Sequence, residues 1–192
     1  MKILVFGRIG QLGSALAEVL SDRYETRFID QPELDLTAPE SVRDHVQTYL
    51  PSIVINAAAY TAVDRAETEP ELAHIINARA PGSLAYACDE AGAVLIHYST
   101  DYVFDGTASM PYTETAAAAP TGVYGQSKLA GEIAVASATQ RYVILRTAWL
   151  YSAVGHNFVK TMLKLANSGQ PIRVVADQFG SPTYAQDLAR VT

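Results

Sequence analysis

The sequence predicts an α/β fold, a Rossmann-like doubly wound parallel sheet with helices on both faces. Short apolar runs of strand length alternate with helix-like stretches along the 192 residues. The first run, Lys2–Phe6, is continuously apolar after its lysine, as expected of a parallel strand buried on both faces. Neither a repeat nor a low-complexity linker divides the chain, so we expect one domain over residues 1–192.

The composition excludes several classes of protein. Apolar residues make up 49% of the chain, and the formal net charge is −6. The chain has no basic run and no apolar stretch long enough to cross a bilayer, so we expect neither nucleic acid nor membrane as a partner. The first residues lack the features of a secretory signal, which makes the cytoplasm the expected location. Cys88 is the only cysteine, which excludes a disulfide framework and a cysteine-based metal site.

A glycine-rich turn follows the first apolar run. Its sequence is Gly7-Arg8-Ile9-Gly10-Gln11-Leu12-Gly13, and the helix-prone stretch Ser14–Leu20 comes next. Small residues in such a turn let backbone N–H groups approach a pyrophosphate at the helix N-terminus, where the helix dipole favours an anion. Because the turn lies between a strand and a helix, we interpret it as a nucleotide-binding turn.

The remaining elements are expected from apolar runs and from turn and cap signals. Further strands are predicted at Thr26–Asp30, Ser52–Asn56, Ala93–Tyr98, Tyr142–Arg146 and Ile172–Val175. Capping boxes at Thr37-Ala38-Pro39-Glu40 and Thr68-Glu69-Pro70-Glu71 predict two helices, the first running to about Leu50 and the second stopping at Gly92. Two more helices are expected at Asn157–Asn167, closed by Gly169, and at Tyr184–Val191. Phe104–Ala119 is predicted to be a long excursion.

Polar or small residues end three of the predicted strands, where an open α/β sheet places its chemistry. Asp30 lies about twenty residues past the glycine turn, where an acid would accept a hydrogen bond from a ribose 2′-OH. A solvated loop acid is an equal alternative for Asp30. Ala57-Ala58-Ala59 follows the third strand and would let a cofactor lie close. Ser99-Thr100-Asp101-Tyr102 follows the fourth.

Tyr124 and Lys128 form a Tyr-x-x-x-Lys pattern, which in a helix places both side chains on one face. A phenol titrates near pH 10, and an ammonium beside it favours the phenolate. The pair could therefore act as a proton donor or acceptor. A surface tyrosine and lysine can share this spacing in any helix, so the hypothesis depends on the glycine turn and the strand ends.

Taken together, these blocks resemble the extended short-chain dehydrogenase/reductases and, more closely, the dTDP-4-dehydrorhamnose reductase family. The blocks that carry the match extend over the whole chain. They are Phe6-Gly7-x-x-Gly10-Gln11-x-Gly13, Asn56-Ala57-Ala58-Ala59-Tyr60-Thr61-Ala62-Val63-Asp64, His97-Tyr98-Ser99-Thr100-Asp101-Tyr102-Val103-Phe104, Val123-Tyr124-Gly125-x-x-Lys128-x-x-Gly131-Glu132, Arg146-Thr147-x-Trp149 and Asp177-Gln178-x-Gly180-x-Pro182-Thr183.

The resemblance implies reduction of dTDP-4-dehydro-β-L-rhamnose, a dTDP-sugar nucleotide, to dTDP-β-L-rhamnose. Tyr124 would donate a proton to the developing alkoxide with help from Thr100, while Lys128 would lower the pKa of Tyr124 and hold the ribose hydroxyls. The residues implied for the cofactor are Gly7, Arg8, Gly10, Gln11, Leu12, Gly13, Asp30, Asp35, Leu36, Ala57, Ala58, Ala59, Tyr124 and Lys128. Those implied for the substrate are Thr61, Val63, Asp101, Tyr102, Trp149, Asn157 and Gln178. For Val63 and Trp149, a plain core position is an equal alternative.

Two residues point to different cofactors. Asp30 favours NADH by repelling a 2′-phosphate, whereas Arg8 could pair with that phosphate. The resemblance implies NADPH, with NADH also accepted. We predict no metal, because the sequence shows no chelating cluster of acids. Relatives are often dimers, which leaves a homodimer open.

Tyr102 separates the reductases from similar enzymes. Sugar-nucleotide 4,6-dehydratases carry a glutamate at the corresponding place, because elimination of water needs a further acid or base. A related NAD-dependent sugar-nucleotide epimerase and a nucleotide-binding regulatory subunit without catalysis both stay open. The family continues into a smaller C-terminal lobe, so we expect this chain to hold the NAD(P)-binding domain and the start of an incomplete substrate-binding lobe.

Overall fold

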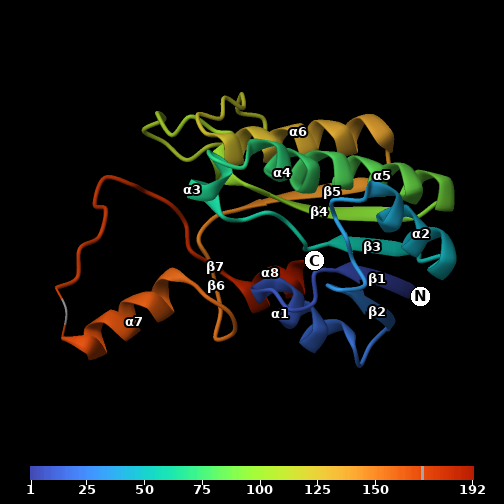
Figure 1. Ribbon diagram of the computed structural model, residues 1–192, viewed down its shortest axis with the longest axis horizontal. Coiled ribbons are helices and arrows are strands. Elements are labelled where there is room, and N and C mark those ends of the chain that lie inside the picture. The colour runs from blue at the N-terminus through green and yellow to red at the C-terminus, as the bar shows by residue number, and fades with distance from the viewer. Residues whose placement is uncertain (170) are drawn as a thin grey trace.

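The structure is a computed structural model that describes residues 1–169 and 171–192, and only the backbone of Pro39. Five parallel strands form one sheet in the order β2-β1-β3-β4-β5 (Figure 1). The strands are β1 (Lys2–Phe6), β2 (Glu25–Ile29), β3 (Ile53–Asn56), β4 (Val94–Thr100) and β5 (Tyr142–Thr147). The predicted α/β class is confirmed, and β1 has the bounds expected from its apolar run.

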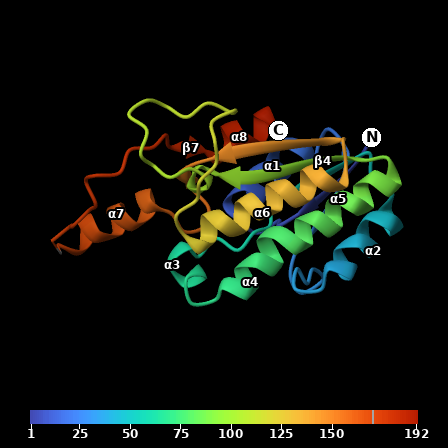
Figure 2. The ribbon, with the colours of Figure 1, turned by 90° about the horizontal axis from the view of Figure 1, so that it is seen from above.

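Helices cover both faces of the sheet (Figures 1 and 2). One face carries α1 (Gln11–Leu20) and α8 (Ala185–Val191), and the other carries α2 (Pro39–Tyr49), α5 (Ala80–Ala91) and α6 (Val123–Ala138). The predicted helix that stops at Gly92 is composite. It starts as α4 (Pro70–His74), continues through the π-helical turn η1 (Ile75–Arg79) and ends as α5. The short helix α3 (Val63–Ala66) precedes it, and a 3₁₀ turn, η2 (Asp101–Val103), follows β4.

Strand β1 supplies side chains to both halves of the core. Leu4 and Phe6 pack in the layer with α2 and α5, whereas Ile3 and Val5 pack against α1 and α8. All four are almost fully buried, with exposed fractions of 0–2%. Burial of such a side chain contributes about 1.5–3 kcal/mol, which explains why this strand is continuously apolar rather than alternating.

The strand order positions the candidate site. The chain passes from β1 to β2 on one side and then to β3 on the other, so the connections after β1 and β3 diverge. Ligands of open α/β sheets bind at such a switch point, beyond the carboxyl ends of the strands. The register pairs Phe6 with Asn56 and Asn56 with His97, which brings the ends of β1, β3 and β4 to one edge.

Three local predictions are wrong. Residues 172–175 are not a strand: they form an exposed extended segment away from β5, where no neighbouring strand offers hydrogen bonds (Figure 1). Both capping boxes fail because each helix begins one residue later than expected, with Ala38 and Glu69 instead of the threonines as the N-cap residues. Thr37 Oγ1 donates to Asp35 Oδ1 at 2.6 Å, and Thr68 Oγ1 donates to the carbonyl oxygen of Arg65 at 3.0 Å. The two helices begin at Pro39 and Pro70 with no side-chain cap.

A smaller unit lies beyond β5. Two short strands, β6 (Leu150–Tyr151) and β7 (Thr183–Tyr184), pair in parallel. Between them α7 (Phe158–Ser168) projects away from the layers of the sheet and buries none of its residues (Figures 1 and 2). Over residues 1–169 and 171–192, no helix combines the length and the apolar character needed to span a membrane.

Candidate active site

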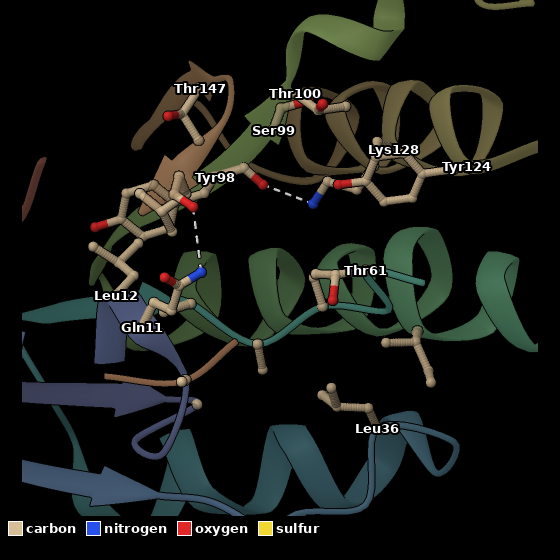
Figure 3. A pocket seen from close by; sticks show the side chains of 18 of the residues that line it. Gln11, Leu12, Leu36, Thr61, Tyr98, Ser99, Thr100, Tyr124, Lys128 and Thr147 are labelled. Atoms are coloured by element: carbon tan, nitrogen blue, oxygen red, sulfur yellow. Dashed lines mark hydrogen bonds between the residues drawn. The ribbon is translucent and has the colours of Figure 1, made fainter. Parts of the chain in front are cut away.

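A cleft of about 820 Å³ lies at the carboxyl edge of the sheet. Its walls come from the glycine turn, the ends of β3 and β4, the start of α6 and the segment after β5 (Figure 3). Most of the predicted site residues line it. They are Gly7, Gly10, Gln11, Leu12, Asp30, Asp35, Leu36, Ala57, Ala58, Ala59, Thr61, Val63, Thr100, Asp101, Tyr102, Tyr124, Lys128 and Trp149.

The three glycines of the turn have different roles. Gly7 has φ +93°, and a Cβ there would lie 2.8 Å from the backbone nitrogen of Ala58. A Cβ on Gly13 would overlap the carbonyl oxygen of Gly7. Gly10 has no atom within 4 Å of the place that a Cβ would take. Gly7 and Gly13 therefore allow close packing of strand, turn and helix, while Gly10 leaves space beside the first amides of α1, where an anion would be stabilised.

Asp30 is bound to the glycine turn. Its Oδ2 accepts from the backbone nitrogen of Ile9, and its Oδ1 accepts from that of Gln31, each at 2.8 Å. Asp30 is therefore not a free loop acid, although it still lines the cleft. Arg8 is exposed and does not line the cleft.

Thr100, Asp101 and Tyr124 form a hydrogen-bonded group at the end of β4. Thr100 Oγ1 donates to Asp101 Oδ1 at 3.1 Å and accepts from the backbone nitrogen of Tyr102 at 3.2 Å. Burial raises the pKa of Tyr124 to about 12, and a hydrogen bond with Thr100 opposes this rise. The rings of Tyr124 and Tyr102 pack edge to face with centroids 5.5 Å apart. Burial also raises the pKa of Asp101.

Lys128 lies one helical turn after Tyr124 and is 2% exposed. Its Nζ donates to the carbonyl oxygen of Tyr98 at 2.7 Å, and Figure 3 shows this nitrogen on the same side of the cleft as the Tyr124 hydroxyl. Burial lowers the pKa of Lys128 to about 8, opposed by the charge of Glu132. The net pKa of Tyr124 is raised in this structure, because burial of the phenol outweighs the hydrogen bond with Thr100.

His97 lies in the sheet beneath this group. It is 1% exposed, and its Nδ1 is 3.2 Å from Asn56 Nδ2. Burial, and then the charge of Lys128, lower its pKa well below the usual value. His97 therefore has a core position. Across the part of the chain that the structure describes, no group of three or more His, Cys, Asp or Glu side chains could hold a metal ion.

The residues predicted for the substrate separate into two groups. Thr61, Val63, Asp101, Tyr102 and Trp149 line the cleft, so neither Val63 nor Trp149 is plain core. Trp149 is 47% exposed, has φ +48°, and packs its ring against Gly180, where a Cβ would lie 2.8 Å from Cε2. Asn157 and Gln178 do not line the cleft. Asn157 is 7% exposed, and Gln178 is exposed on the segment before β7.

Comparison with known proteins identifies the family. A family model described as "RmlD substrate binding domain" matches residues 1–192. The chain belongs to the RmlD family. The resemblance stated from the sequence is thereby confirmed.

Named relatives of the RmlD family agree with this assignment. The chain is 46% identical over 200 residues to the dTDP-4-dehydrorhamnose reductase of Escherichia coli K12, with 100% of this chain and 66% of the relative covered. It is 47% identical over 189 residues to the same-named protein of Burkholderia thailandensis, covering 98% of this chain and 63% of that one. The chain thus spans just under two thirds of these curated relatives.

Solved structures of the family have the same fold. The reductase of Bacillus anthracis in complex with NADP superposes with a TM-score of 0.95 at 44% identity, covering 99% of this chain and 68% of the other. The Clostridium acetobutylicum protein gives a TM-score of 0.95 at 45% identity, with 100% and 68% covered.

The sequence analysis missed several residues that line the cleft. They include Leu34, Ile76, Tyr98, Thr147 and His156. Thr147 could have been found, because it ends β5 directly beside Thr100 of β4 in the register. No sequence feature marks Leu34 and Ile76 as site residues, because an apolar side chain in a loop or helix is ordinarily predicted to lie in the core.

Proposed function

We propose that this chain carries the cofactor-binding and proton-donating part of a reductase that converts dTDP-4-dehydro-β-L-rhamnose to dTDP-β-L-rhamnose. The observation that carries the proposal is the placement of Thr100, Tyr124 and Lys128 in one cleft with the glycine turn. The identity to named reductases supports the choice of substrate. The cofactor would supply the hydride that reduces the C4 carbon of the sugar.

Residues of this chain would donate the proton that the reduction requires. Tyr124 would donate its hydroxyl proton to the C4 oxygen, and Thr100 would stabilise the resulting phenolate by turning its hydroxyl hydrogen from Asp101 Oδ1 to the phenolate oxygen. The Lys128 ammonium would add positive charge beside the phenolate and hold the ribose of the cofactor. Solvent would return the proton to Tyr124 after the alcohol leaves. The ketone thereby gains one hydride and one proton.

NADPH is the proposed cofactor, with NADH also accepted. The turn fits a diphosphate because Gly10 leaves open space beside the N-terminus of α1. Ala57, Ala58 and Ala59 offer a wall of small side chains to the rest of the dinucleotide. The NADP complex of the Bacillus anthracis relative supports the assignment. Asp30 faces the same cleft and would favour the cofactor that lacks a 2′-phosphate.

The domain organisation belongs to this proposal. Residues 1–192 would form the NAD(P)-binding domain, with the β6–β7 pair and α7 as the start of a substrate-binding lobe. Thr61, Val63, Asp101, Tyr102 and Trp149 would contact the sugar nucleotide. The proposed partner is a dTDP-sugar, which the identity to the named reductases supports.

Replacement of Tyr124 by phenylalanine tests the proposal. In the complete gene product, Tyr124→Phe should bind NADPH normally but oxidise it with the ketosugar nucleotide roughly 10²- to 10⁴-fold more slowly, the usual contribution of a general acid. Tyr86→Phe is the matched control, because Tyr86 is 51% exposed on α5. Undiminished activity of Tyr124→Phe would remove this phenol from the mechanism.

A further inference from the structure

Gln11 connects the glycine turn to the opposite wall of the cleft. It is the first residue of α1, and its side chain reaches the segment after β6. Its Oε1 accepts from Asn157 Nδ2 at 2.9 Å and lies 3.3 Å from Ser152 Oγ, while its Nε2 lies 3.4 Å from the carbonyl oxygen of Leu150. One side chain thus joins two parts of the cleft that are about 140 residues apart in sequence.

The segment 152–157 is folded tightly around this contact. Asn157 Nδ2 also donates to the carbonyl oxygen of Ser152 at 2.8 Å, and Ser152 Oγ donates to that of Val154 at 2.7 Å. Ser152 and Asn157 are 6% and 7% exposed. Gly155, with φ +73°, packs against Gln11, and a Cβ on Gly155 would lie 3.1 Å from Gln11 Cγ.

Asn157 in turn starts helix α7. It is the N-cap residue, and its Oδ1 accepts from the backbone nitrogen of Lys160 at 3.1 Å. Both amide hydrogens and one of the two lone pairs of the amide oxygen are engaged, so the Asn157 side chain has no hydrogen left to donate to a ligand. Because α7 buries none of its residues, packing does little to hold it, and its position depends on contacts at its N-terminus.

We propose that Gln11 is a positioning residue through which a dinucleotide on the glycine turn steadies the start of α7. A diphosphate that accepts hydrogen bonds from the first amides of α1 would fix the backbone of Gln11. The Gln11–Asn157 bond would then restrain Asn157, the N-cap, and with it the wall that contains Gly155 and His156. This inference rests on the proposed function, because it requires a cofactor at the turn. It gives Asn157 an indirect role in substrate binding.

Hydrogen exchange on the 192-residue chain tests the link without any turnover. Addition of NADP⁺ should slow amide exchange both in the turn, residues 7–14, and in residues 157–168, the latter on the order of 5- to 10-fold, an ordinary coupling between two sites. Gln11→Ala should keep the slowing at residues 7–14 and lose it at residues 157–168. Gln47→Ala is the matched control, because Gln47 lies on α2 and bonds to Glu90 instead of the cleft.

Two further variants separate positioning from a general loss of structure. Gln11→Glu keeps an acceptor for Asn157 and Ser152, so it should restore the slowing at residues 157–168 even if its charge weakens NADP⁺ binding. Asn157→Ala should lose the slowing as Gln11→Ala does, and the double variant should lose no more than either single one. In the complete gene product, Gln11→Ala should raise KM for the sugar nucleotide roughly 5- to 10-fold.

The outcomes distinguish this inference from the proposed function. Absence of any NADP⁺ effect at residues 7–14 in the unaltered chain would overturn both. Slowing at residues 7–14 together with unchanged slowing at residues 157–168 in Gln11→Ala would overturn the link alone. Additive effects of Gln11→Ala and Asn157→Ala would also contradict it, because two ends of one contact should not act independently.

Discussion

The Lys128 ammonium donates a hydrogen bond to the carbonyl oxygen of Tyr98 across 2.7 Å, although Lys128 is 2% exposed. A buried ammonium is costly unless its hydrogens are engaged, and burial accordingly lowers the pKa of this lysine to about 8. The strand end thus holds a cation beside Tyr124 at a free-energy cost. Such a cost is expected at a site whose geometry serves chemistry more than stability.

The first prediction concerns the pH dependence of stability that Lys128 causes. The folded pKa of Lys128, about 8, lies below the value near 10.4 of an exposed lysine, so the unfolded chain binds more protons between these values. The free energy of unfolding of the natural chain, relative to Lys128→Met, should therefore rise by roughly 2–3 kcal/mol between pH 7.5 and pH 10.5. Urea denaturation of both proteins at several pH values measures this difference. A difference that does not change with pH would show that Lys128 is not buried as described.

His97 should make the protein less stable in mild acid. Its folded pKa is well below the usual value, so below about pH 6.5 the unfolded chain takes up a proton that the native chain does not. His97 should therefore lower the free energy of unfolding by up to about 1.4 kcal/mol for each pH unit of acidification. His97→Gln should lose that part of the slope in denaturation curves between pH 7 and pH 5. The exposed His74 supplies the control His74→Gln, which should retain the slope of the natural chain.

Two alanine substitutions in the glycine turn should change the free energy of unfolding by different amounts. Gly13→Ala should lower the free energy of unfolding by about 2 kcal/mol or more, because its Cβ would overlap the carbonyl oxygen of Gly7 and force the backbone to shift. Gly10→Ala should change it by less than about 0.5 kcal/mol, since nothing lies near its Cβ. Thermal and urea denaturation give both values. Equal stability of the two variants would contradict the packing described for the turn.

The ion pair between Glu132 and Arg146 should contribute more to the free energy of unfolding than an exposed pair of the same kind. Arg146 donates to Glu132 through Nε at 2.9 Å and Nη2 at 2.7 Å, with the carboxylate side chain 9% exposed. Glu132→Gln should cost roughly 2–3 kcal/mol in unfolding free energy, toward the lower end for a buried pair because Arg146 is partly exposed.

The exposed pair Arg43–Glu90 provides the matched control. Its side chains are 40% and 38% exposed, so Glu90→Gln should cost less than about 1 kcal/mol.

Loss of the Glu132 charge should also lower the pKa of Lys128 further, because that charge opposes the effect of burial. Similar costs for Glu132→Gln and Glu90→Gln would contradict the burial difference between the two pairs.

Local patterns predicted the framework of the fold well. The run Lys2–Phe6 is β1, and the glycine turn leads into α1, because burial on both faces and close backbone packing leave few residue types acceptable there. Patterns that depend on a neighbour were less reliable. Residues 172–175 look like a strand but have no partner strand, and Thr37 and Thr68 bond away from the helices that they were expected to cap.

The sequence alone determined the α/β class, the family resemblance and many of the residues that meet in the cleft, since these depend on local periodicity and on short spacings. Only the tertiary structure decided what surrounds each of them. Burial raises the pKa of Tyr124 and lowers that of Lys128, Asp30 binds the turn, and Gln11 holds Asn157. The reason is physical: desolvation and hydrogen bonds between distant residues depend on how the layers pack, which no single stretch of the chain encodes.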